Sequence, residues 1–137
     1  FWDRIEEGRR RHPDDPCAQL LAYFDGLAER ASQPAYRGCA LTNAVVEYPD
    51  PDHPVRRGAM RMKAEVRDWL AAQARAMGAR DPVLLADGLA LLMEGAYASG
   101  QAHAPPGPVA QVGRFARVLI DAFCGPSVPS PGRGEDV

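Results

Sequence analysis

Prolines divide this chain into segments in which apolar residues recur every three or four positions. One clear stripe runs from Cys17 to Ala31, and another runs from Val109 to Phe123. This spacing places the apolar side chains on one face of an α-helix. The pattern predicts an all-α fold of about five to six helices.

Two helix starts can be located from the residues that precede proline. Asp14 or Asp15 lies before Pro16, and Asp81 lies before Pro82. An aspartate accepts a hydrogen bond from the free N–H groups of a first helical turn, and proline is tolerated there because it lacks that N–H. We therefore predict one helix from Pro16 and another from Pro82.

A rigid connector with three prolines covers residues 49–54. Asp52 or His53 occupies the N-cap position for the helix that follows, and Gly78 is expected just beyond its C-terminus. The segment before the connector, residues 38–48, could form a helix or a strand, because several of its residues are β-branched. A lone strand cannot satisfy its backbone groups, and the sequence offers no second strand, so we predict a helix.

Size and charge limit the function classes. The 137 residues suit one domain with its own core. Sixteen basic and eighteen acidic residues give a net charge of −2, so the chain alone is not expected to bind nucleic acid. The three cysteines, without a C-x-x-C pair, are typical of the reducing cytoplasm. No apolar run approaches the roughly 20 residues that a membrane-spanning helix needs.

The predicted domain covers residues 1–124. The chain begins at Phe1 without a Met, and we interpret residues 1–12 as the end of a helix that starts upstream. Residues 125–137 are rich in Pro, Gly and Ser and lack an apolar period, so they are predicted to be a disordered tail.

The phrase Arg37-Gly38-Cys39-Ala40-Leu41, followed by the connector Pro49-Asp50-Pro51-Asp52-His53-Pro54-Val55-Arg56, resembles the C-terminal domain of TetR/AcrR-family transcriptional regulators. The resemblance covers about residues 1–124 and is most specific in residues 37–56. It implies an effector-binding and dimerisation domain whose last two long helices form a four-helix bundle with a partner copy. Residues 1–12 would then end the helix that links this domain to a helix-turn-helix domain absent from the sequence.

The resemblance also implies a mechanism. A small apolar ligand would favour a dimer geometry that releases operator DNA, so the protein would be a bacterial, cytoplasmic repressor. No enzyme activity, cofactor or metal is expected. The alternative is a stand-alone helical module that binds a small molecule or dimerises without a role at DNA.

Candidate ligand-binding residues lie on helices that converge in the family fold. Large apolar side chains with a few polar groups are typical of a small-molecule pocket. The predicted set is Tyr23, Phe24, Leu27, Cys39, Asn43, Met62, Val66, Trp69, Glu94 and Tyr97. Ordinary core packing is the better interpretation for Leu27 and Val66.

Glu94 lies in an apolar stretch, where a carboxylate must be paired or protonated. The favoured partner is an arginine of a neighbouring helix, for example Arg61. A cationic or hydroxylated ligand is the functional alternative.

A dimer surface is predicted because residues 83–98 are apolar around nearly the whole helix. The pairs Gly95 and Ser99, and Ala96 and Gly100, place small residues four positions apart, where a second helix can approach closely. Close packing within the chain is the competing interpretation. The predicted interface residues are Leu85, Leu92, Ala96, Ser99, Gly100, Val112, Phe115 and Leu119.

Metal binding and catalysis are both disfavoured. His12, His53 and His103 form no H-x-x-x-H pair, and a capped proline turn explains Asp52 and His53. Cys39 with His53 could form a thiol and base pair, but no third orienting residue is apparent.

Overall fold

The computed structural model describes residues 1–125 and is all-helical over that range. The prediction of an all-α fold is confirmed. The elements are α1 (Trp2–Arg11), α2 (Pro16–Ala31), α3 (Ala40–Glu47), α4 (Pro54–Ala76), α5 (Pro82–Ala102), the 3₁₀-helix η1 (Pro108–Gln111) and α6 (Val112–Cys124). The predicted tail falls almost entirely on residues 126–137, outside the described residues.

The helix starts follow the predicted caps. The Asp15 carboxylate accepts a hydrogen bond of 2.9 Å from the Ala18 N–H, and Asp81 accepts one of 3.0 Å from Leu84. Between the two alternatives for α4, His53 is the N-cap residue, and its Nδ1 accepts from the Val55 N–H at 3.2 Å.

Two boundaries differ from the sequence prediction. Helix α5 continues to Ala102 instead of ending at Ala98. The last predicted helix is divided, because residues 108–111 form η1 and α6 begins at Val112. The 3₁₀ turn places Val109 in the core, with 4% of its surface exposed.

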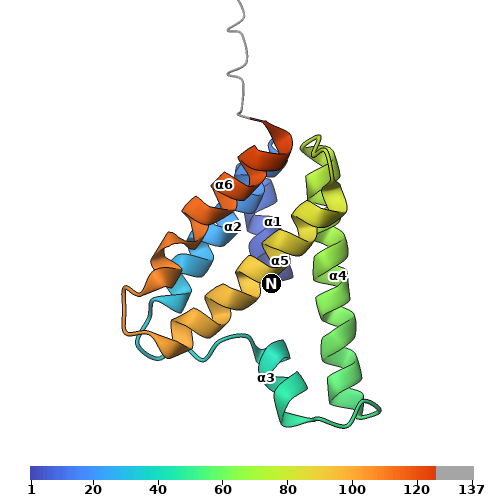
Figure 1. Cartoon of the computed structure of the whole chain (residues 1–137), viewed down its shortest axis with the longest axis vertical. Coiled ribbons are helices and arrows are strands. Elements are labelled where there is room, and N and C mark those ends of the chain that lie inside the picture. Colours follow the sequence, from blue (N-terminus) through green and yellow to red (C-terminus); the bar gives the residue numbers. More distant parts are fainter. Residues whose placement is uncertain (126–137) are drawn as a thin grey trace, which may run out of the picture.

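The core forms around α2, which contacts α1, α4, α5, α6 and η1. Figure 1 shows α6 beside α2, with α5 crossing in front and α4 on the opposite side. The largest fully buried side chains come from α2, α4 and α5: Leu20, Phe24, Leu27, Leu70, Leu85 and Leu89. Fully burying one such side chain contributes about 1.5–3 kcal/mol relative to leaving it in water.

Helix α3 stands apart from this core. It buries none of its own residues and lies between the start of α4 and the C-terminal half of α5 (Figure 1). Polar contacts hold it: Arg56 of α4 donates to the Val45 carbonyl at 2.6 Å, and Thr42 donates to Glu94 of α5 at 2.9 Å.

Helix α5 is long and apolar enough, by length and composition, to cross a membrane, contrary to the sequence expectation. Its composition explains this, since only Asp87 and Glu94 carry charge between Pro82 and Ala102. In the fold, Leu85, Leu89 and Met93 of this helix are buried in the protein core, but most of its apolar segment is not. Core helices of soluble proteins pass the same test, so this property is weak evidence for a membrane span.

Candidate ligand-binding site

A cavity of about 480 Å³ lies where α1, α2, α4 and α5 meet the segment that leads into α3. This volume is within the range typical of small-molecule sites. Its walls combine aromatic and aliphatic side chains with two arginines. The lining residues are Phe1, Arg4, Tyr23, Leu27, Arg30, Tyr36, Gly38, Cys39, Ala40, Leu41, Met62 and Tyr97.

Two tyrosines join α2 to α5 at this cavity. The hydroxyls of Tyr23 and Tyr97 lie 2.9 Å apart in a hydrogen bond. Burial raises the pKa of Tyr97, and the neighbouring Tyr23 raises it further. Burial also raises the pKa of Tyr23. Both phenols are therefore neutral at physiological pH and can donate or accept hydrogen bonds.

Arg30 is fixed beside this pair. Its guanidinium lies over the Tyr23 ring, 5.7 Å from the ring centroid, in a cation–π arrangement. A Cβ at Gly26 would lie 3.0 Å from Arg30 Nη1, so the glycine leaves the guanidinium room to fold back along α2. Burial lowers the pKa of Arg30, and the charge of the nearby Arg4 lowers it further.

The structure brings part of the predicted ligand set together at the cavity: Tyr23, Leu27, Cys39, Met62 and Tyr97. The other predicted residues lie elsewhere. Phe24 points into the core and is fully buried, because it is one helical step from Tyr23 and faces another direction. Val66 and Trp69 pack against the edge of the core, and Trp69 reaches the site only through Phe1, whose ring centroid is 5.7 Å away.

Asn43 and Glu94 are paired within the chain. Asn43 is exposed and donates to the Arg37 carbonyl at 2.9 Å. Glu94 forms an ion pair with Lys63 of α4 and accepts from Thr42. The expectation of an intrachain partner for Glu94 is correct in kind, but the suggested Arg61 is wrong. Glu94 is not among the cavity-lining residues.

Sequence reasoning missed Phe1, Arg4, Arg30 and Tyr36. A signal for Arg30 was present, since Tyr23, Leu27 and Arg30 follow one another at four and three residues and share a helix face. Arg30 lies off the apolar core stripe of α2, so the stripe alone does not point to it. Residues that line a cavity can lie on the helix face next to the core stripe, as Arg30 does on α2.

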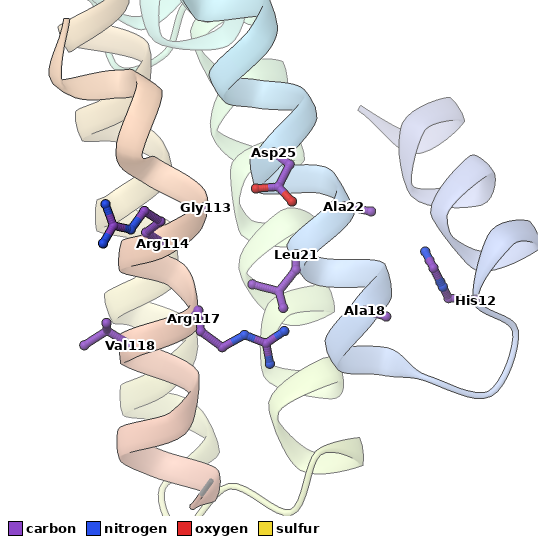
Figure 2. Close-up of a pocket in the computed structure, with 9 residues that line it drawn as sticks. All are labelled: His12, Ala18, Leu21, Ala22, Asp25, Gly113, Arg114, Arg117 and Val118. Atoms are coloured by element: carbon purple, nitrogen blue, oxygen red, sulfur yellow. The ribbon is translucent and has the colours of Figure 1, made fainter. Parts of the chain in front are cut away.

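A second, more open groove lies between α2 and α6 beside the end of α1. Figure 2 shows Asp25 of α2 and Arg117 of α6 projecting into the space between these helices, with His12 at the far side of α2. Arg117 donates to the Cys17 thiol at 3.3 Å. A side chain at Gly113 would collide with the Asp25 carboxylate, so this glycine allows α2 and α6 to approach closely.

Several predicted interface residues are buried within the chain itself. Leu85, Ala96 and Val112 are at most 4% exposed, so they have no surface left for a partner. Gly100 packs against α2, because a Cβ there would lie 2.7 Å from the Ala31 carbonyl oxygen. Close packing within the chain is thus the correct interpretation for the Ala96 and Gly100 pair.

The remaining predicted interface residues differ in exposure. Leu92 and Leu119 are half-buried against the core, and Ser99 is half-buried as well. The Ser99 hydroxyl has no hydrogen-bond partner among the described residues. Phe115 is 59% exposed and is the predicted residue best placed to contact a partner.

The exposed apolar surface shares Phe115 with the predicted one, but its other residues each lie one position before a predicted residue. Leu84 and Leu91 of α5 and Phe115 and Val118 of α6 are between 56% and 74% exposed. Gly88 lies between the two leucines and meets α6 closely, because a Cβ there would lie 2.9 Å from Leu119 Cδ2. These exposed residues of α5 and α6 therefore lie on either side of the contact between Gly88 and Leu119. We call Leu84, Leu91, Phe115 and Val118 the α5–α6 face.

The proposed thiol and base pair is not assembled. Cys39 lines the cavity, whereas the His53 ring caps α4 and stacks on Tyr48 at a centroid distance of 4.2 Å. Within residues 1–125, no group of three or more His, Cys, Asp or Glu side chains could hold a metal ion.

Comparison with known proteins gives concordant similarities in structure and sequence. The crystal structure of a TetR-family transcriptional regulator from Streptomyces coelicolor matches 89% of this chain with a TM-score of 0.81 and 27% identity. A putative TetR transcriptional regulator from Streptomyces avermitilis matches 80% of the chain with a TM-score of 0.63 and 28% identity. The HTH-type transcriptional regulator YjdC of Escherichia coli is 31% identical over 77 residues, or 56% of this chain.

The chain spans only part of each relative. It covers 60% and 59% of the two Streptomyces structures and 40% of YjdC. No family model matches the chain. The two structural neighbours are both described as TetR-family transcriptional regulators, the second as a putative one. The chain therefore has a TetR-like fold and is similar to TetR-family transcriptional regulators.

Proposed function

We propose that this chain is the effector-binding and dimerisation domain of a TetR-like transcriptional repressor. One observation carries the proposal: a cavity of about 480 Å³ lies inside a fold that superposes on a TetR-family regulator with a TM-score of 0.81. Residues far apart in the sequence, Phe1 at the N-cap of α1 and Tyr97 of α5, line the same cavity. A ligand held there would contact residues of five helices, α1 to α5.

The position of α1 supports a route from the ligand to DNA. Phe1 packs edge-on against Tyr23 and Trp69, with ring centroids 5.1 Å and 5.7 Å away. By the family resemblance, α1 is the end of the helix that leads to the DNA-binding domain. A ligand shifts the equilibrium only if it binds one position of α1 better than the other. Contacts with Phe1 and Arg4 supply that difference.

The α5–α6 face supports a homodimer. Leu91, at 74% exposed, and Phe115, at 59%, would leave water when this face meets its two-fold copy. Gly95 has no side chain and faces open space, because a Cβ there would meet nothing within 4 Å in the single chain. The surface of α5 is therefore low at this position. Small residues beside large ones let two helices approach closely, as a four-helix bundle of α5 and α6 from two copies requires.

The test uses the complete gene product and its own promoter. The repressor shifts the promoter fragment in a mobility assay, and a ligand that fills the cavity releases the DNA. Tyr97→Trp should fill part of the cavity and reduce the response to the ligand while leaving DNA binding in place. A complete gene product that never binds DNA would refute the proposal.

The alternative is a stand-alone helical module that binds a small molecule or dimerises without a role at DNA. The reading frame upstream of Phe1 separates the two functions. A basic three-helix segment there supports the repressor, and its absence supports the module.

A further inference from the structure

The polar groups of the cavity all have the same electrostatic preference. Its charged residues are two arginines, Arg4 and Arg30, and its lining includes no aspartate or glutamate. The neutral polar groups include the hydroxyls of Tyr36 and of the hydrogen-bonded pair Tyr23 and Tyr97, which still has one proton to donate to a ligand. Such a lining favours an anion and disfavours a cation.

Neither arginine has its charge balanced within the described part of the chain. The ion pairs found there involve Arg9, Arg10, Arg11, Lys63 and Arg67. Arg4 and Arg30 also donate no side-chain hydrogen bond to residues 1–125. Arg30 is half-buried, so its charge is partly removed from water without an acidic partner in residues 1–125.

The geometry fixes where an anion would lie. Arg30 is held over the Tyr23 ring, and its charge and that of Arg4 are close enough to repel. An anion between them removes that repulsion and gains charge-assisted hydrogen bonds, which are about twice as strong as neutral ones. The guanidinium fork matches a carboxylate in particular, since both groups are planar and can form two parallel hydrogen bonds.

The rest of the cavity is apolar. Phe1, Leu27, Leu41 and Met62 supply aromatic, aliphatic and thioether surface. This surface is suited to the body of a small molecule, and Met62 can adapt to its shape because its side chain is flexible.

Resting on the proposed effector site, we propose that the ligand is an amphipathic anion: a carboxylate bound by Arg30 and Arg4, attached to an apolar body that lies against Met62 and Tyr97. The sequence predicts only that the ligand is apolar. This proposal adds that the ligand must also carry a negative charge. The cationic ligand considered for Glu94 is excluded from this cavity, because it would meet two arginines and no carboxylate.

The test compares ligands that share a body and differ in charge. Octanoate, octanamide and octylamine form one series, and phenylacetate, phenylacetamide and phenethylamine form another. Each compound is titrated into the full chain by calorimetry. We expect at least one carboxylate to bind tenfold more tightly than its amide, a difference of about 1.4 kcal/mol, and the amines to bind least.

Two variants test whether the two arginines cause the preference for a carboxylate over an amide. Arg30→Gln should reduce the affinity for the carboxylate to that for the amide while leaving amide binding unchanged. Arg4→Gln, at an exposed position, tests the same charge without altering a buried residue. Arg57→Gln is the matched control, because Arg57 is exposed on α4 and does not line the cavity.

The outcomes separate this inference from the proposed function. Saturable binding of amides as tight as that of carboxylates would overturn the anionic class and leave the effector site intact. Tighter binding of amines would do the same. If no compound of either series binds, the effector site itself is refuted along with the inference.

Discussion

Thr42 of α3 donates a hydrogen bond of 2.9 Å to Glu94 of α5, whose other carboxylate oxygen forms an ion pair with Lys63 of α4. Three helices therefore meet at one carboxylate. Helix α3 has no buried residue, so this junction and the bond from Arg56 to the Val45 carbonyl are its principal polar attachments. The contacts give Glu94 a structural role within the chain.

Glu94→Ala should loosen α3 more than it destabilises the fold. The ion pair is partly exposed and contributes about 0–1 kcal/mol, and the hydrogen bond contributes about 0.5–1.5 kcal/mol. We expect a loss of about 1 kcal/mol in the free energy of unfolding, with faster hydrogen exchange confined to residues 40–47. Glu65→Ala, at an exposed position without an ion pair, is the control. Unchanged exchange in α3 would contradict the role of the junction.

Phe115→Glu should abolish or weaken the proposed dimer. The substitution places a charge in the centre of the α5–α6 face, where an unpaired charge strongly disfavours burial. Light scattering should report twice the chain mass for the wild type and a smaller mass for the variant. Val46→Glu adds the same charge at a 75% exposed valine of α3 and should leave the mass unchanged. A wild-type chain that is folded and monomeric would refute the dimer.

Gly100→Ala should destabilise the fold because the close approach of α5 to α2 leaves no room for a methyl group. Its Cβ would lie 2.7 Å from the Ala31 carbonyl oxygen, a backbone atom that cannot turn away. Gly58→Ala is the matched control, since its nearest neighbour would be the flexible Arg61 side chain at 3.8 Å. Alanine is favoured over glycine inside a helix by about 0.5–1 kcal/mol, so urea titration should show the control gaining stability and Gly100→Ala losing it.

Stability should fall at alkaline pH because of the tyrosine pair. Burial raises the pKa of Tyr23 and of Tyr97 in the folded chain. Tyrosines of the unfolded chain ionise near pH of about 10, so above that pH the folded state binds more protons than the unfolded state. The contribution of this pair to the free energy of unfolding should therefore be constant below about pH 10 and decrease above it. Replacing both residues by phenylalanine should flatten this decrease in urea titrations.

The chain by itself should not bind duplex DNA. With a net charge of −2, the chain lacks the excess of positive charge that attracts DNA phosphates. Fluorescence anisotropy with labelled promoter DNA should stay unchanged on addition of residues 1–137. Sequence-selective and salt-dependent binding would contradict this prediction.

The helices were predictable from the sequence because their signals are local. Asp15, Asp81 and His53 cap helices next to proline, and Gly78, with φ of +74°, follows α4 as expected. Each of these interactions spans only a few residues. The order of the α-helices was therefore predictable, whereas the short 3₁₀-helix η1 was not.

The site was predictable only in part because helix rotation depends on tertiary packing. Along α5 every face is apolar, so periodicity could not decide that Leu85 faces the core while Leu84 and Leu91 face outward. Likewise, Arg30 lines the cavity because α1 places Arg4, and α5 places Tyr97, beside the same face of α2. The ion pair of Glu94 with Lys63 depends on how α4 is rotated against α5. That rotation is set by tertiary packing and cannot be predicted from residue spacing within one helix.

The exposed position of α3 has a kinetic consequence. Ala40 and Leu41, at its beginning, form part of the cavity wall, yet the helix buries none of its own residues. Its displacement breaks a few partly exposed polar contacts and leaves the core around Phe24 and Leu89 intact. Local openings of this kind cost much less free energy than global unfolding. If the proposed effector site binds a ligand, we therefore expect local detachment of α3 to widen the entrance to the cavity without unfolding of the whole chain.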